Sequence, residues 1–391
     1  MRFPRPLKKI MRTVAYLAII LFISLGLFEV LLRFGLYEPQ TRMYEYTILF
    51  DRNVLFRIAP LCRPDINEMG YRGADFGREK NDFEKRVLFL GDSFVMGDNV
   101  APEKTIPAAL ERALDGVEVF NMGVLAYGPD QSLVQLLEDG IDLNPDMVVL
   151  GIFPANDFQD IDRSRIFSLD GGGHLTRNAD NVITDSMPKF RTVFLLNYLQ
   201  YILRPMIDKN HKFLSRDYEF LLHDLFSDFY DWEFLYNPGS IESKEKIDLM
   251  RAILSRFRDD LRAKHIVFGV VIIPSYPNIV HEDAFLEIDI DQQQFERLKD
   301  SKEGFFGPEN TTSRLCEELN IPYLNLYPEF LGFEERERAL LYESGDWHLS
   351  PFGNQIAGDL AASVLVGPLL SKTSGRLRTD QQSWRRDSVV N

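Results

Sequence analysis

The feature that most constrains the fold is a set of short apolar runs in which hydrophobic residues do not alternate with polar ones. Runs of this length are typical of strands that are buried on both faces, as in a parallel sheet covered by helices. They predict a buried parallel sheet of about five strands. The runs lie at 86–90, 117–120, 147–150, 266–273 and 323–326.

Helical periods separate these runs. Apolar side chains recur at helical spacing over 106–114 behind Thr105, over 133–137 before Gly140, over 249–261 and over 356–364. Strands that alternate with helices predict a doubly wound α/β sheet with right-handed crossovers. With 391 residues, 45% of them hydrophobic, the chain is long enough for such a core.

The N-terminus carries a separate signal. The 19 residues of 14–32, VAYLAIILFISLGLFEVLL, contain one charged side chain, Glu29. At about 1.5 Å per residue, this length nearly crosses a hydrocarbon core of about 30 Å. The five basic residues that precede it favour a cytoplasmic N-terminus; they are Arg2, Arg5, Lys8, Lys9 and Arg12.

An uncleaved, single-pass membrane anchor is therefore the interpretation that we favour, with the remaining chain extracytoplasmic. Two alternatives stay open, a cleaved signal peptide and a buried core helix. The exit sequence LLRFGLYEP has no small-residue cleavage site, which disfavours the first of them. The apolar segment 193–206 is shorter and contains Asn197 and Gln200, so we expect a core or interfacial helix there.

The chain divides into an N-terminal stub with the anchor, an irregular linker and wrapping segment rich in proline and glycine, an α/β domain, and a basic tail. A long insertion rich in aromatic residues interrupts the domain. It is interpreted as a small core of its own, as a lid or sugar-stacking wall over the site, or as a membrane-surface contact. We predict the stub and anchor at 1–36, the linker and wrapping segment at 37–83, the α/β domain at 84–370 with its insertion at 158–245, and the basic tail at 371–391.

Charge and cysteine content exclude several classes of partner. The net charge is −15, and the two chain ends hold clusters of basic residues, so the body between them is more acidic still and would repel a phosphate backbone. By this criterion we expect no nucleic-acid partner. Cys62 and Cys316 have no metal-ligand spacing, and the chain has no dinucleotide or nucleotide loop, so we expect no metal and no cofactor. The two cysteines either pair in an oxidising compartment or remain separate thiols.

Several polar residues follow the predicted strands directly. The first run leads into Gly91, Asp92 and Ser93, which places a serine hydroxyl at the carboxyl end of a parallel strand, where α/β sheets build their sites. The second leads to Gly123 and the third to Asn156, at the same edge. A free backbone N–H and an asparagine amide are donors of the kind that an oxyanion hole requires.

A second motif stands near the C-terminus, in the sequence GDWHLSP from 345 to 351. Ser350 is a natural N-cap and Pro351 a natural first helical residue, which leaves Asp346 and His348 in the loop before a helix. In such a turn the carboxylate can hold the imidazole Nδ1 and leave Nε2 free for a serine. Each motif alone can also be explained by a purely structural role, as a helix cap or a turn.

Taken in order, these four stretches resemble the SGNH, or GDSL-like, hydrolase family over roughly 84–366, and in particular its membrane-anchored bacterial members associated with exopolysaccharides. The resemblance implies that Ser93 is the nucleophile, His348 the base and Asp346 its orienting group. It implies further that Ser93, Gly123 and Asn156 form the oxyanion hole. Two departures stand out: Pro154 replaces the glycine usual before x-N-D, and the last pair is D-x-H where many members have D-x-x-H.

The family resemblance also implies a substrate class. It points to a serine esterase that removes acyl groups, acetyl first among them, from an extracytoplasmic carbohydrate or cell-envelope polymer through an acyl-enzyme. One alternative is an O-acyltransferase that uses the same three residues. Another is a non-catalytic scaffold in envelope polysaccharide assembly, which the presence of every catalytic residue type disfavours.

Overall fold

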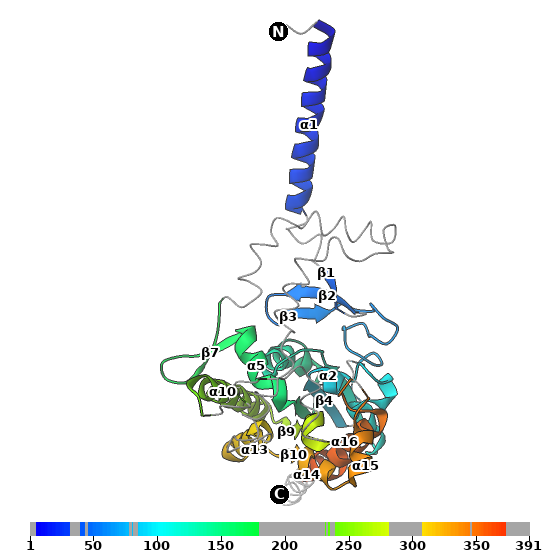
Figure 1. Ribbon diagram of the computed structural model, residues 1–391, viewed down its shortest axis with the longest axis vertical. Coiled ribbons are helices and arrows are strands. Elements are labelled where there is room, and N and C mark those ends of the chain that lie inside the picture. The colour runs from blue at the N-terminus through cyan, green and yellow to red at the C-terminus, as the bar shows by residue number, and fades with distance from the viewer. Residues whose placement is uncertain are drawn as a thin grey trace, which may run out of the picture.

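The computed structural model describes residues 5–31, 40–43, 46–77, 80, 85–179, 231, 234, 239–280, 307–344 and 346–372. Figure 1 shows a long N-terminal helix, α1 (Arg5–Leu31), that stands apart from a body of strands and helices. Within it, the 20 residues of Met11–Val30 have a mean hydropathy of 2.2, and none of the window is buried. The core-helix interpretation is therefore wrong, while a membrane anchor and a signal sequence both fit this length and composition.

The central sheet has five strands in the order β10-β9-β6-β4-β5, and every neighbouring pair is parallel. The predicted α/β class and all five predicted strands are confirmed. Because all strands run the same way, their carboxyl ends share one edge of the sheet. The strands are β4 (Lys85–Gly91), β5 (Val117–Gly123), β6 (Met147–Ile152), β9 (Val267–Ile272) and β10 (Tyr323–Asn325).

The helices cover both faces of this sheet. They are α2 (Ser93–Met96), α3 (Ile106–Arg112), α4 (Pro129–Gln135), α5 (Pro154–Ser164), α10 (Ile241–Ala263), α11 (Tyr276–Ile279), α13 (Gly307–Leu319), α14 (Leu326–Leu331), α15 (Glu335–Arg338) and α16 (Pro351–Leu360). Short 3-10 or π-helical turns are η2 (Pro102–Lys104), η3 (Leu136–Gly140), η4 (Ile141–Leu143), η7 (Ala339–Leu341) and η8 (Ala361–Val366).

Two hydrophobic cores lie on opposite faces of the sheet, which explains why its strands show no polar alternation. Along β4, Leu88 and Leu90 enter the core beneath α4, α5, α10 and α13. Val87 and Phe89 enter the other core, beneath α3, α14 and α16. Fully burying one such side chain stabilises the fold by roughly 1.5–3 kcal/mol, so both faces of a strand must be apolar.

The segment 37–83 differs from the irregular linker that we predicted. Its described part forms an antiparallel three-stranded sheet of β1 (Gln40–Met43), β2 (Tyr46–Asp51) and β3 (Leu55–Ile58). Ile48 and Phe56 are buried in the same core as α10. The strands are only four to six residues long, so the nearby prolines and glycines concealed them in the sequence.

Only parts of the insertion at 158–245 belong to the described residues. It opens with the end of α5 and a small hairpin, β7 (Phe167–Leu169) and β8 (Leu175–Arg177). Of the aromatic cluster, Phe234 is described, buried against Phe158 with ring centroids 4.4 Å apart. The predicted segment 193–206, the tail beyond residue 372 and the other aromatic residues lie outside the described residues; the latter are Tyr218, Phe220, Phe226, Phe229, Tyr230, Trp232 and Tyr236.

The two cysteines are unpaired in the structure. Cys62 is partly buried and Cys316 fully buried. Burial raises the pKa of the Cys316 thiol to about 12, so this side chain is a protonated core residue. The structure thus favours separate thiols, the second of our two interpretations.

Candidate active site

The serine stands at a sharp turn from β4 into α2. Asp92 is the N-cap of α2, where its carboxylate accepts the Phe94 N–H at 2.9 Å, and Ser93 is the first helical residue. The turn needs glycine at Gly91, which has φ +153° and would bring a Cβ to 2.5 Å from Val95. The capping role that the sequence allowed for Ser93 falls to Asp92, which leaves the Ser93 hydroxyl free for another partner.

A second glycine lets β5 end directly beside α2. A Cβ on Gly123 would lie 2.3 Å from the Met96 nitrogen, so only glycine permits this close approach of backbone to backbone. Gly91 and Gly123 are also register partners across β4 and β5. The ends of the two strands therefore lie side by side at the edge that carries Ser93.

The histidine lies in the loop before α16. Ser350 caps that helix by accepting the Gly353 N–H at 3.1 Å, and Pro351 is its first residue, as predicted. The loop is closed at its base, where Glu343 donates its N–H to the His348 carbonyl at 2.8 Å. Asn99, which follows α2, donates to the Leu349 carbonyl at 3.0 Å and so ties this loop to the serine turn.

These elements bring three predicted residues into one chain of hydrogen bonds. The Ser93 Oγ lies 2.8 Å from the His348 Nε2, and the His348 Nδ1 lies 2.9 Å from the Asp346 Oδ1. The Phe94 ring packs on the imidazole with centroids 4.6 Å apart, which restricts the rotation of the imidazole. This geometry matches the order nucleophile, base and orienting carboxylate.

The charges around His348 favour the protonated form of its imidazole. Burial lowers the pKa of His348, but the hydrogen bond and charge of Asp346, together with the charge of Asp92, outweigh it and raise the pKa above its usual value. The hydrogen bond from His348 in turn lowers the pKa of Asp346. A carboxylate at Asp346 therefore stabilises the protonated imidazole of His348.

This arrangement predicts a pH dependence. Only neutral His348 can accept the serine proton, so kcat/KM for p-nitrophenyl acetate should fall as pH drops through the raised pKa, with an apparent value above 6.5. Asp346→Asn removes the negative charge that raises the pKa of His348. The acid limb of the profile should therefore move to lower pH, and the maximal rate should also be lower. The matched control Asp170→Asn, at an exposed Asp–His pair, should leave the profile unchanged. An acid limb that stays in place in Asp346→Asn would contradict the assignment.

The three expected oxyanion donors, at Ser93, Gly123 and Asn156, differ from one another in their hydrogen-bond partners. The Ser93 N–H is the first of α2, a position without an intrahelical acceptor. The Gly123 N–H, in contrast, donates to the Asn121 side-chain oxygen at 3.0 Å. It can serve an oxyanion only when Asn121 releases it. Asn121 is a residue that the sequence reasoning missed, although N-x-G after a strand is a typical Asx-turn pattern.

Asn156 lies in the first turn of α5, directly after β6. Its side-chain oxygen is buried and has no hydrogen-bond partner among the described residues. Pro154, the departure from the family pattern, is the first residue of this helix, a position where its missing N–H costs nothing. The proline therefore fits the helix start and leaves the amide of Asn156 at the strand edge.

Buried carboxyl groups that the sequence reasoning also missed lie behind this edge. Burial raises the pKa of Asp92 to about 6. Burial and the charges of Asp92 and Asp160 raise that of Asp157 well above its usual value. Asp157 accepts the Phe153 N–H at 2.7 Å and so fixes the start of α5. Among the described residues no group of three or more His, Cys, Asp or Glu side chains is arranged to hold a metal ion.

Comparisons with known proteins give a likeness of fold only. No family model and no curated protein sequence matches the chain. Among solved structures, a protein described as a lipolytic member of the G-D-S-L family from Desulfitobacterium hafniense DCB-2 is similar at 13% identity. It covers 72% of this chain and 100% of its own, with a TM-score of 0.35.

Two acetylxylan esterases give the same level of likeness. The acetyl xylan esterase AlAXEase is 12% identical, covers 72% of this chain and 100% of its own, and has a TM-score of 0.38. One from Geobacillus stearothermophilus is 14% identical, covers 72% of this chain and 93% of its own, and has a TM-score of 0.36. At these values the likeness concerns the fold and says nothing about substrate.

Proposed function

We propose that the protein is a serine ester hydrolase that removes acyl groups, acetyl in the first place, from an extracytoplasmic carbohydrate or cell-envelope polymer. The observation that carries this proposal is the continuous hydrogen-bonded chain from Ser93 through His348 to Asp346. A serine is a weak nucleophile unless a base removes its proton, and here the base is adjacent and held by a carboxylate.

The proposed reaction has two stages. The Ser93 Oγ attacks the ester carbonyl carbon while its proton passes to the His348 Nε2. The oxyanion that forms accepts hydrogen bonds from the Ser93 N–H and the Asn156 amide, and from the Gly123 N–H once Asn121 releases it. The carbon–oxygen ester bond then breaks, and His348 returns the proton to the leaving alcohol. Water, deprotonated by His348, attacks the acyl carbon. The bond from that carbon to the Ser93 Oγ breaks, His348 returns the proton to the Oγ, and the carboxylic acid leaves.

Aromatic side chains beside the site support a sugar-bearing substrate. Trp347, between Asp346 and His348, has φ +60°, a strained conformation for a bulky residue. Its ring stacks on Tyr276, at 6.4 Å between centroids and 15° between planes. Tyr276 follows β9 at the catalytic edge and packs on Tyr342. Tyr276 and Trp347 are partly exposed, whereas Tyr342 is buried, so the first two offer apolar surface on which the C–H face of a sugar ring can pack.

The decisive measurement uses the full-length protein in detergent micelles. It should hydrolyse p-nitrophenyl acetate and release acetate from an acetylated polysaccharide. Adding an acceptor sugar separates the two group-transfer outcomes: constant acetate release supports hydrolysis, whereas acetyl transfer to the acceptor at the expense of free acetate would make the protein an O-acyltransferase. Absence of turnover on every ester would favour the scaffold.

We propose in addition that α1 is an uncleaved anchor with the N-terminal basic residues in the cytoplasm. The exposed apolar window of Met11–Val30 supports this, as does the basic flank before it. Cell fractionation should recover the full-length chain with the membranes after a high-salt wash. Mature protein in the soluble fraction with a new N-terminus near residue 36 would instead identify α1 as a signal peptide.

A further inference from the structure

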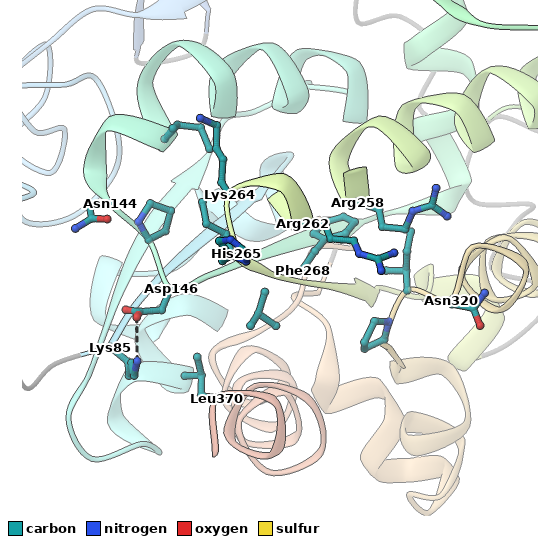
Figure 2. Close-up of a pocket in the computed structure, with 16 residues that line it drawn as sticks. Lys85, Asn144, Asp146, Arg258, Arg262, Lys264, His265, Phe268, Asn320 and Leu370 are labelled. Carbon is teal, nitrogen blue, oxygen red and sulfur yellow. Dashed lines mark hydrogen bonds and ion pairs between the residues drawn. The ribbon is translucent and has the colours of Figure 1, made fainter. Parts of the chain in front are cut away.

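A large hollow in the described part of the chain lies away from the proposed active site. It has a volume of about 950 Å³ and lies at the amino-terminal edge of the sheet (Figure 2). Its walls come from the starts of β4, β6, β9 and β10 and from the end of α10. The six residues of β9 place it about 20 Å from the catalytic edge. The hollow is therefore separate from the proposed active site.

The charge of this hollow is opposite to that of the protein. Its lining holds four cationic side chains and one carboxylate, in a chain whose net charge is −15. Figure 2 shows Arg258, Arg262 and Lys264 at the end of α10, and Lys85 and Asp146 together on another side of the hollow. The cations are Lys85, Arg258, Arg262 and Lys264.

Two of these cations make no ion pair with a described residue, although the charge of Asp259 still acts on Arg262. Lys85 is paired with Asp146 at 3.0 Å, and Arg258 is held by Asp259 at 2.8 Å. Arg262 and Lys264 are exposed, and neither makes an ion pair with any residue that the structure describes. His265, in a left-handed conformation with φ +58°, turns the chain sharply behind them. The end of α10 therefore presents adjacent positive charges at the mouth of a hollow.

The rest of the lining indicates the kind of anion. Ile266, Phe268 and Pro322 contribute apolar surface between the charges. A ligand that fits must combine repeated negative charges with apolar C–H faces, and it must enter a recess. A flat anionic membrane surface meets a protruding face and does not fill a recess, whereas a narrow chain does. The combination favours a carboxylated sugar chain.

We propose that this basic hollow, defined by Lys85, Arg258, Arg262, Lys264 and the apolar residues between them, is a non-catalytic binding site for an acidic polysaccharide. The inference stands on the charge and shape of the hollow and does not depend on esterase activity. The site would hold a polyanionic glycan chain on the protein, away from Ser93.

The test measures binding of a fluorescent polygalacturonate oligomer to the full-length protein in detergent, by anisotropy. The double variant Arg262→Glu/Lys264→Glu should weaken binding by about tenfold or more, and 0.5 M salt should weaken wild-type binding likewise. The matched control Lys104→Glu/Lys244→Glu makes the same charge change at two exposed positions outside the hollow that also make no ion pair with the described residues, and it should stay within about twofold of wild type.

Competition experiments with other ligands identify the class of ligand that the hollow binds. A neutral xylo-oligosaccharide of equal length should not compete. Inorganic phosphate that competes as well as the oligomer would replace the proposal with a small-oxyanion site, and binding to anionic lipid vesicles alone would replace it with a membrane contact. Equal binding by the hollow and control variants would also overturn it. If the charge reversal lowers thermal stability, Arg262→Gln/Lys264→Gln must show an intermediate loss of binding for the proposal to hold.

Discussion

Replacing Ser93 by alanine should lower kcat/KM for p-nitrophenyl acetate by roughly 10³–10⁶-fold, because no other group on the hydrogen-bonded chain can form the acyl-enzyme. His348→Ala should cost about as much, since the serine proton then has no acceptor at 2.8 Å. The double variant should be hardly worse than either single one, because the two residues act as one unit. Steady-state kinetics on the purified proteins would measure all three.

Two exposed positions provide matched controls. Ser363→Ala removes a hydroxyl that binds only its own helix backbone, and His174→Ala removes an imidazole that pairs with Asp170 on the surface. Both should retain wild-type turnover and thermal stability. Additive losses in the Ser93 and His348 variants, or residual turnover near wild type in either, would refute the catalytic assignment and leave the scaffold as the better interpretation.

Replacing Asn156 by alanine should lower kcat by about 10²–10³-fold with little change in KM, because its amide binds the oxyanion more tightly than the ground-state carbonyl. The loss should be at the upper end of that range, since the Gly123 N–H is already engaged by Asn121. Pre-steady-state kinetics with p-nitrophenyl acetate would place the effect on the acylation step.

The isosteric variant Asn156→Asp tests the cause of that loss. It keeps the shape of the side chain but removes the donor and adds negative charge, so it should be at least as impaired as Asn156→Ala. Asn178→Ala, at an exposed asparagine on the hairpin of β7 and β8, should behave as wild type. A rise in KM at constant kcat in Asn156→Ala would instead make Asn156 a substrate-binding residue.

Much of this molecule follows from local sequence pattern. Apolar runs buried on both faces and capped helices, such as α16 behind Ser350, need only short-range information, and the sequence predicted them. The residues Ser93, Asp346 and His348 were also identifiable, because their positions after a strand and before a helix are visible in the chain. The short strands β1–β3 were not, since four to six residues among prolines give too weak a period.

The tertiary structure alone decided which residues far apart in the sequence come into contact. Ser93 and His348 are 255 residues apart, and only the parallel sheet and the tie from Asn99 to Leu349 bring them to 2.8 Å. The same holds for the engagement of the Gly123 N–H by Asn121 and for the basic hollow built from α10 and the strand starts. Sequence patterns report the environment of each element, whereas a site depends on distances that exist only after the elements pack.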